Sequence, residues 1–394
     1  MRYTDVAIIG GGLAGATTAA MLGRAGIAAT LIDPHAVAVP DFRCEKLGDD
    51  QFALYQKTGL SDALLNVTTV DREVWIGRFG YIVDKKPSQN LGVRYHDLVN
   101  AVRGEIPTGV RFIAAKAVAV ATSDDRQRVT LSDGQEISAR LIVIANGLNK
   151  GLRRTLGIES QVISTSHSIT IGFDLAPLGR PAFDFPAMTY YAERARDRMA
   201  YITLFPIGNS MRANLMVYRP IDDPWFTLMR ETPEVALRKL MPRLERVTGD
   251  FKVIAPIRIR PADLYEAQGH VQRGVVLVGD AFATSCPAAG TGTDKVFTDV
   301  ERLCHAYIPQ WLSTPGMSVD KIAAYYADPV KCSVDARSKA KAFHLRKLST
   351  SPGPTWLARR WLRFLVRLGQ GILRQLRAAA TAKPLSQTKT RSAA

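Results

Sequence analysis

Residues 6–33, VAIIGGGLAGATTAAMLGRAGIAATLID, decide the fold expected for the first part of the chain. One apolar run ends at Gly10, an alanine-rich helix is expected over residues 16–25, and a second apolar run covers residues 29–33. Strand, glycine-rich turn, helix and strand follow one another without interruption. This order predicts the opening βαβ unit of a nucleotide-binding lobe.

The glycine spacing in this stretch suits a pyrophosphate. The motif G-x-G-x-x-G gives a tight turn, a close approach of backbone to phosphate, and close packing of the helix on the strand, while the helix N-terminus favours negative charge. Asp33 ends the second strand 18 residues after Gly15, where its carboxylate can accept both ribose hydroxyls of an adenosine and disfavours a 2′-phosphate. The motif alone does not separate NAD from FAD. The candidate residues of the loop are Gly10, Gly12, Leu13, Ala14 and Gly15.

The charge is distributed unevenly along the 394 residues. The net charge is +16, of which the segment from Lys331 onward contributes +14 (15 Lys and Arg against Asp335), so the preceding residues carry +2. A nearly neutral body with a basic C-terminal segment indicates no nucleic-acid partner. The four cysteines have no CxxC spacing, so we expect neither a metal site nor disulfides, and a cytoplasmic location. No secretory signal and no apolar run of about 18 residues is found.

Residues 275–295, VVLVGDAFATSCPAAGTGTDK, form a second motif some 265 residues downstream of the first. The chain here resembles the FAD-dependent class A flavoprotein monooxygenases, the family of para-hydroxybenzoate hydroxylase and the ubiquinone-pathway hydroxylases. The resemblance implies that Asp280 binds the ribityl chain of FAD. It also implies that Pro287, Gly290 and Gly292 open a helix facing the pyrimidine ring of the flavin, where the helix dipole stabilises negative charge. Asp294 departs from the asparagine that the family has at its position.

Two further segments match the same family. Arg43, in DFRCEKL, stands where the family places an arginine against the FAD pyrophosphate. Gly147 and Arg153, after the strand LIVIANG, match a family segment that contacts FAD and, indirectly, the nicotinamide nucleotide. Asn146 and Lys150 replace an aspartate and a serine there, which puts the reductant in doubt.

The pattern along the chain, together with this resemblance, predicts an α/β fold. We expect a Rossmann-like FAD-binding lobe, an inserted antiparallel-sheet substrate lobe and C-terminal helices. Residues 1–163 and 266–330 are expected to form the FAD-binding domain, and residues 164–265 the substrate-binding sheet. Residues 331–377 are expected to form a basic helical region, and residues 378–394 a disordered tail.

The resemblance implies an NAD(P)H-dependent hydroxylase. NAD(P)H would bind transiently and reduce FAD, and a flavin C4a-(hydro)peroxide formed with O2 would transfer one oxygen atom to a small hydrophobic substrate, such as an aromatic, isoprenoid or polyketide-like compound. No catalytic residue is predicted. The pocket candidates Cys44, Glu45, Lys46, Cys286 and His167 are each expected to have packing or ion-pair roles.

Three alternatives stay open. Prenyl reductases of the geranylgeranyl type share the fold, and Tyr201, Phe205 and Pro206 partly match their Y-x-W-x-F-P motif, with Thr203 in place of tryptophan. Flavin halogenases also share the fold, but their W-x-W-x-I-P motif is absent. A flavoprotein that serves only as a membrane- or partner-binding module is the third.

Residues 356–377 predict a basic amphipathic helix. Arg359, Arg363 and Arg367 begin an arginine-rich stripe, and Trp361 and Leu365 begin an apolar stripe on the other side. One hypothesis places this helix on an anionic membrane surface, which would make the protein peripherally membrane-associated. The other packs its apolar stripe on the core of the protein and leaves the arginines solvated.

Overall fold

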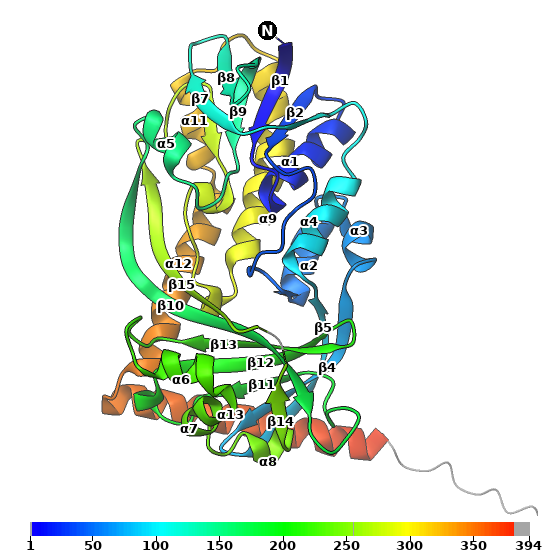
Figure 1. Cartoon of the computed structure of the whole chain (residues 1–394), viewed down its shortest axis with the longest axis vertical. Coiled ribbons are helices and arrows are strands. Elements are labelled where there is room, and N and C mark those ends of the chain that lie inside the picture. Colours follow the sequence, from blue (N-terminus) through cyan, green and yellow to red (C-terminus); the bar gives the residue numbers. More distant parts are fainter. Residues whose placement is uncertain (1, 255, 382–394) are drawn as a thin grey trace, which may run out of the picture.

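The computed structural model describes residues 2–254 and 256–381 of the chain, and the side chains as far as residue 377. Its first lobe contains a seven-stranded sheet in the order β6–β2–β1–β9–β8–β7, with β16 also beside β9 (Figure 1). The strands are β1 (Arg2–Ile9), β2 (Ala29–Asp33), β6 (Arg111–Ala114), β7 (Ala117–Ala121), β8 (Gln127–Leu131), β9 (Glu136–Ile144) and β16 (Val275–Leu277). Strands β6, β2, β1, β9 and β16 run parallel, so their carboxyl ends meet at one edge, where nucleotides bind in such sheets.

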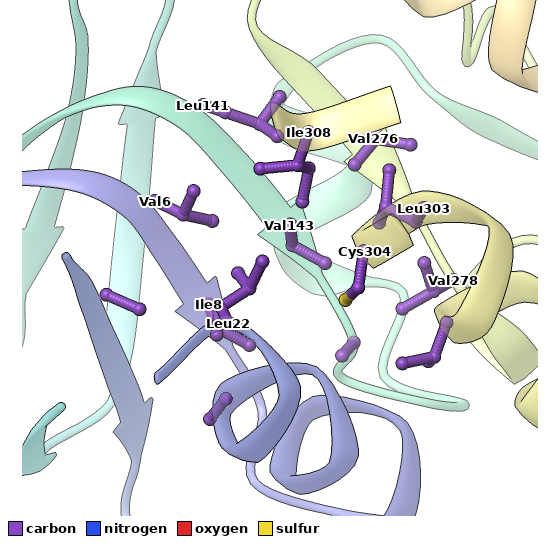
Figure 2. Close-up of a cluster of buried hydrophobic side chains, with 14 of the residues drawn as sticks. Val6, Ile8, Leu22, Leu141, Val143, Val276, Val278, Leu303, Cys304 and Ile308 are labelled. Carbon is purple, nitrogen blue, oxygen red and sulfur yellow. The ribbon is translucent and has the colours of Figure 1, made fainter. Parts of the chain in front are cut away.

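The core of this lobe lies on both faces of the sheet. Leu141 and Val143 of β9 join Val6 and Ile8 of β1 in a buried cluster against α1 (Leu13–Arg24) and the segment after α9 (Gly292–Arg302), as Figure 2 shows. Residues 142 and 144, in alternation with these, are buried in a second cluster on the opposite face. Strand β9 is therefore apolar on both faces, and the sheet is a central layer.

Further helices pack in both lobes. In the first half of the chain they are α2 (Asp49–Gln56), α3 (Ser61–Leu65), α4 (Tyr95–Gly104) and α5 (Gly151–Thr155). In the second half, α6 (Trp225–Glu231), α7 (Pro233–Leu240), α8 (Glu245–Thr248) and α13 (Pro354–Thr381) pack on the second lobe, and the others are α10 (Ile308–Leu312), α11 (Val319–Tyr326) and α12 (Pro329–Thr350). The long helix α12 crosses from the first lobe to the second (Figure 1).

The second lobe contains a nine-stranded sheet in the order β14–β10–β13–β12–β11–β4–β5–β3, with β15 also paired to β10. Its strands are β3 (Lys46–Leu47), β4 (Thr69–Arg78), β5 (Tyr81–Gly92), β10 (Glu159–Pro177), β11 (Met188–Tyr191), β12 (Met199–Ile207), β13 (Ser210–Val217), β14 (Phe251–Val253) and β15 (Arg258–Gln268). All neighbouring strands are antiparallel except β4 and β11. Ile169, Ile171 and Phe173 of β10 face a core closed by Trp225 and Leu237, and Thr170 between them points to the other side, because side chains alternate along a strand.

Three strands of the second sheet, β3, β4 and β5, come from the segment that the sequence analysis assigned to the first lobe. The hairpin β4–β5 carries Glu73, Lys85 and Lys86, residues that weaken a strand pattern, and Pro87 interrupts it. Its place in the sheet depends on the pairing of Trp75 with Met188, more than a hundred positions away. The alternation of side chains along one segment cannot predict a pairing with a strand so distant in the sequence.

Helix α13 packs on β4 and β5 through a narrow seam. Phe364 and Leu368 contact the buried cluster of Val74, Ile76 and Val83, and at Gly371 an added Cβ would lie 2.2 Å from the Val83 carbonyl oxygen. Most of the predicted apolar stripe instead faces outward. Of its five members, Trp361, Leu365, Ile372 and Leu376 are between 47% and 62% exposed, as are Leu362, Val366 and Leu373 beside them.

The hypothesis that this stripe packs on the core is therefore wrong for most of its members. The helix also continues to Thr381, four residues into the segment expected to be disordered. The rest of that segment, residues 382–394, lies outside the described residues. Among the described helices, none is long and apolar enough to cross a membrane.

Candidate active site

A cleft of about 1160 Å³ lies between the two sheets, bounded by residues of both lobes. It is larger than the ~300–1,000 Å³ of an ordinary small-molecule pocket, so it suits one extended ligand with room beside it. Eleven of the twelve residues predicted to hold the cofactor line this cleft: Gly10, Gly12, Leu13, Ala14, Asp33, Arg43, Gly147, Asp280, Pro287, Gly290 and Gly292. They come from six separate segments of the chain.

Gly15, the twelfth, lies behind the loop. A Cβ at this position would be 1.8 Å from the carbonyl oxygen of Gly10, so only glycine lets α1 approach β1 this closely. Gly10 itself has a φ of +101°, and its Cβ would lie 2.7 Å from the backbone oxygen of Ala145. The two glycines thus make the sharp strand-to-helix turn that exposes the N–H groups of α1 to the cleft.

Asp33 is tied to the glycine loop at the end of β2. Its carboxylate accepts hydrogen bonds from the Gly11 N–H at 2.6 Å and the His35 N–H at 2.9 Å. Arg103 of α4 approaches it at 3.5 Å and donates to the Gly11 carbonyl oxygen at 2.7 and 2.9 Å. Sequence reasoning missed Arg103 because one arginine near the end of an ordinary amphipathic helix belongs to no motif.

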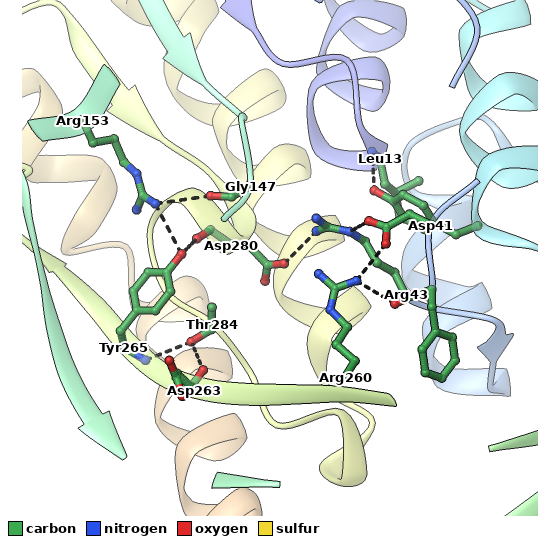
Figure 3. A network of polar contacts seen from close by, with 12 residues as sticks. Leu13, Asp41, Arg43, Gly147, Arg153, Arg260, Asp263, Tyr265, Asp280 and Thr284 are labelled. Carbon is green, nitrogen blue, oxygen red and sulfur yellow. Dashed lines mark hydrogen bonds and ion pairs between the residues drawn. The ribbon is translucent and has the colours of Figure 1, made fainter. Parts of the chain in front are cut away.

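Arg43 joins the segment after β2 to the Gly-Asp loop after β16. Its Nη1 lies 3.3 Å from Asp280 Oδ2, and its Nε donates to Asp41. Asp41 also pairs with Arg260 of β15 at 3.0 Å, so Figure 3 shows a chain of alternating charges across one side of the cleft. Residues that are more than 200 positions apart are therefore brought together as the sequence analysis expected.

Arg153 takes a different place from the one implied by resemblance. It is only 1% exposed and lies behind the cleft wall, where it donates to the carbonyl oxygens of Ala281 and Gly147. The Tyr265 hydroxyl beside it donates to the Asp280 carbonyl oxygen at 2.7 Å (Figure 3). Arg153 and Tyr265 therefore fix the two loops that face the cleft. Tyr265 had no sequence signal, since it is one aromatic residue in a strand.

A family model described as an FAD binding domain matches residues 3–308. The chain belongs to this FAD-binding family.

Curated relatives match this chain over most of its length and of their own. The Escherichia coli (strain K12) 3-demethoxyubiquinol 3-hydroxylase is 23% identical over 79% of this chain and 83% of its own length. The Rhodospirillum rubrum ubiquinone hydroxylase UbiL is 26% identical over 78% of this chain and 73% of its own. A Mycobacterium tuberculosis menaquinone reductase is 29% identical over 74% and 73%. The crystal structure of p-nitrophenol 4-monooxygenase PnpA from Pseudomonas putida superposes with a TM-score of 0.72 at 17% identity, over 94% of this chain and 95% of that one, which shows a shared fold.

The three positions at which the sequence departs from the flavin-monooxygenase pattern, Asn146, Lys150 and Asp294, all lie on the cleft wall. Asn146 Oδ1 and Asp294 Oδ1 are buried and lack a hydrogen-bond partner among the described residues. Buried acceptors are nearly always satisfied, so each calls for a donor from a bound ligand. The ribityl hydroxyls and the N3–H of FAD are donors of this kind. The residues of the cleft therefore fit FAD at these two atoms.

The Gly-Asp loop is anchored from behind by a buried ionic network. Asp299 of α9 accepts the Gly279 N–H at 2.9 Å and the Lys331 ammonium at 2.7 Å. Asp335 pairs with both Lys331 and Lys295, at 3.0 and 2.9 Å. Burial raises the pKa of Asp299, while Lys331 opposes that shift. The network has two cations and two anions, and it ties α12 to the loop that carries Asp280.

The strands β10, β12 and β13 of the second sheet offer the cleft a mostly polar, uncharged surface, whereas β3, β5 and β15 add Lys46, Lys86, Arg260 and Asp263. Thr170, Thr203, Asn214 and Met216 of β10, β12 and β13 line it. Tyr201 of β12 also lines it and donates to the Ala288 carbonyl oxygen at 2.5 Å, which links the sheet to the loop before α9. These side chains point into the cleft because they alternate with the core residues of the same strands. Sequence patterns did not single them out apart from Tyr201 and Thr203.

The pocket candidates have the packing and ion-pair contacts expected of them. Glu45 pairs with buried Arg212 at 2.7 Å, and His167, fully buried, contacts the Ser164 hydroxyl at 3.1 Å. Cys286 is buried 3.4 Å from the Ser168 hydroxyl. Cys44 lines the cleft, but burial raises its pKa to about 12, which keeps the thiol neutral and poorly nucleophilic.

Proposed function

We propose that this chain is an FAD-dependent monooxygenase that takes its electrons from NAD(P)H and hydroxylates a hydrophobic substrate. One observation carries the proposal: a single continuous cleft connects the glycine loop, the Gly-Asp loop and the face of the second sheet. The whole sequence has no second G-x-G-x-x-G motif, which suits a nicotinamide nucleotide that binds briefly and leaves. The hydroxylases among the relatives support the same reaction class.

The residues divide the work of holding and shielding the cofactor. When bound, FAD supplies two-electron reduction and the activation of dioxygen. The N–H groups at the start of α1, with Arg43, are expected to hold the pyrophosphate, and Asp33 the adenosine ribose. Asp280 is expected to hold the ribityl chain, and the N-terminus of α9 to stabilise negative charge on the flavin ring. The second sheet then excludes water from the reacting groups.

The substrate is expected to be apolar with few polar groups, such as an aromatic, isoprenoid or polyketide-like compound. The sheet face offers hydroxyl, amide and thioether groups and no charged side chain on β10, β12 or β13. Such a surface orients a neutral ring or chain without a large desolvation cost. Relatives that act on quinone-type molecules agree with this class.

Oxygen dependence tests the proposed reaction. Full-length protein loaded with FAD is expected to oxidise NADH or NADPH slowly in air without substrate. One molecule of O2 should be consumed and one molecule of hydrogen peroxide released for each nucleotide oxidised. A hydrophobic substrate should raise that rate and suppress peroxide. NAD(P)H-driven turnover of menaquinone at equal rates in air and in oxygen-free buffer would instead support the reductase alternative. An oxygen electrode and a peroxide assay on the same sample distinguish these outcomes.

We also propose that α13 rests on an anionic membrane surface. Its outward face presents six large apolar side chains, from Leu362 to Leu376, each about half exposed or more. Arg359 and Arg377 follow the same helix beside this apolar face. Exposed apolar residues flanked by arginines suit a helix that lies in the headgroup region. A location at the membrane would give the cleft access to apolar substrates dissolved in the bilayer.

Vesicle flotation tests this proposal. Leu362→Glu with Leu373→Glu should lower binding to phosphatidylcholine vesicles that contain phosphatidylglycerol by about tenfold or more, because each glutamate opposes apolar insertion. Val37→Glu with Val162→Glu, at exposed positions on the body, is the matched control. Deleting α13 is a poorer test, since it uncovers Ile76 and Val83. Equal flotation of the two double variants would end the membrane proposal.

A further inference from the structure

A second cavity, of about 70 Å³, lies between α13 and the second sheet. Its apolar wall consists of Ile76, Val83, Met199, Leu348 and Phe364. This volume holds a small group of a few heavy atoms rather than a whole substrate. The cavity therefore suits one end of a ligand whose remainder lies elsewhere.

The cavity adjoins the large cleft. Tyr191 of β11, Leu345 of α12, and Arg363 and Arg367 of α13 line both spaces. Lys341, one turn before Leu345, lines the same end of the cleft. A ligand in the cleft can thus extend past Tyr191 and Leu345 to reach the cavity under α13.

All the charged side chains that line this cavity are cations. Five of its lining residues are arginines, Arg78, Arg194, Arg360, Arg363 and Arg367, and none is an acid. Two acids close in sequence to the lining residues, Glu193 and Asp197, already have partners in the protein. Glu193 accepts a hydrogen bond from Tyr190 at 2.7 Å, and Asp197 pairs with Arg194 at 3.2 Å. Clustered cations without anions in an apolar setting raise the free energy of the protein by mutual repulsion and by desolvation.

Three of the five arginines are occupied by the protein itself. Arg194 pairs with Asp197. Arg78 donates to the Ala192 carbonyl oxygen at 3.0 Å, and Arg360 donates to the Leu348 and Ser351 carbonyl oxygens at 3.0 and 2.9 Å. The contacts of Arg360 join α13 to the end of α12.

Arg363 and Arg367 are left available. Neither donates a hydrogen bond or forms an ion pair with the described residues, and Arg367 lies over the Tyr191 ring at 4.5 Å. Arg363 is partly exposed to solvent, and its partial burial and then the neighbouring Arg367 lower its pKa. Burial, followed by the charge of Arg360, also lowers the pKa of Arg78 to about 10. A bound anion would relieve both effects.

We propose that the substrate is an acidic amphiphile, whose carboxylate or phosphate is bound by Arg363 and Arg367 under α13 while its apolar body extends into the cleft. This inference rests on the proposed function, because it takes the large cleft as the place of the reaction. It makes Arg363 and Arg367 specificity-determining residues: they select an oxyanion at a fixed distance from the reacting end. Guanidinium groups suit either oxyanion, since they donate several hydrogen bonds in one plane.

Ligand binding to full-length, FAD-loaded protein tests the inference without any turnover. The probes are dodecanoate, dodecyl phosphate and dodecanol, which share an apolar chain and differ in the charge of the end group. We expect at least one acid to bind about tenfold or more tightly than dodecanol, measured by calorimetry below the micelle-forming concentration of the two acids and below the solubility limit of dodecanol. Arg363→Gln with Arg367→Gln should bring that acid to the level of dodecanol.

Arg359→Gln is the matched control, since Arg359 lies on the same helix and lines neither space. It should leave the preference for the acid unchanged. Equal affinity of the unaltered protein for acids and alcohol would overturn the proposal, and so would an acid preference that survives in the double variant. Retained FAD and oxygen uptake in the same samples would show that the proposed function stands even if this inference fails.

A vesicle measurement separates a substrate oxyanion from a lipid headgroup. Vesicles of phosphatidylcholine with phosphatidylglycerol present phosphodiester headgroups and contain no soluble carboxylate or phosphate monoester. If the double variant loses vesicle binding and keeps its preference for soluble acids, Arg363 and Arg367 serve the membrane, and the substrate proposal is wrong. The reverse pattern, with soluble acid binding lost and vesicle binding kept, supports it.

Discussion

Gly15→Ala is expected to abolish retention of FAD. The new Cβ would lie 1.8 Å from the Gly10 carbonyl oxygen, so α1 and the strand must separate. Overpacking of this kind costs about 1–3 kcal/mol, and here it moves the N–H groups expected to hold the pyrophosphate. The affinity for FAD should fall by about a hundredfold or more, because the hydrogen bonds and charge of the loop depend on its position. The measurement is the ratio of FAD to protein after desalting.

Gly104→Ala is the matched control for this variant. Gly104 is the last residue of α4, and nothing lies within 4 Å of an added Cβ there. It should keep FAD and lose no stability, since alanine is the better helix former. Circular dichroism should show that both variants are folded. Normal FAD content in folded Gly15→Ala protein would mean that the glycine loop does not hold the cofactor.

Asp299→Ala is expected to have the largest effect on stability. It leaves the ammonium of Lys331, which is 1% exposed, without its shortest ion pair and frees the Gly279 N–H. Removing one partner of a buried pair costs about 3–5 kcal/mol. The free energy of unfolding, from urea titration of protein stripped of FAD, should fall by that amount. Glu105→Ala breaks the exposed pair with Arg24 and should cost only about 0–1 kcal/mol.

The double variant Asp299→Ala with Lys331→Met tests whether the stability lost in Asp299→Ala comes from the charge of Lys331. In Asp299→Ala the two cations Lys295 and Lys331 share Asp335; methionine removes the excess cation, and Asp335 keeps its pair with Lys295 at 2.9 Å. The double variant should therefore be more stable than Asp299→Ala alone. If it is as unstable or less stable, the loss comes from packing or from the Gly279 hydrogen bond rather than from an uncompensated charge.

The local chemistry of the cofactor loops could be predicted from sequence. Gly10, Asp33 and Gly279 stand within two residues of the carboxyl end of an apolar strand, and the parallel order of β1, β2, β9 and β16 brings those strand ends to one edge. The motif spacing therefore predicted the positions of Gly10 and Asp33, while the role of Asp280 was implied by the family resemblance. Arg43 required the family resemblance, because its loop has no regular structure of its own.

What the sequence did not predict depends on tertiary contacts. Arg103 and Tyr265 act through neighbours distant in sequence, so neither changes a local pattern. The hairpin β4–β5 was missed because charged residues obscure its alternation. The outward orientation of α13 depends on a close approach at Gly371, which puts a narrow seam rather than the apolar stripe on the body.

FAD content tests the central claim most directly, namely that six separated segments form one site for one cofactor. Full-length protein is saturated with FAD, desalted and denatured, and the released flavin is measured against protein. We predict one FAD for each chain, and a loss of that flavin in Gly15→Ala but not in Gly104→Ala. A chain that retains no FAD, or one whose FAD is unaffected by Gly15→Ala, would contradict the account.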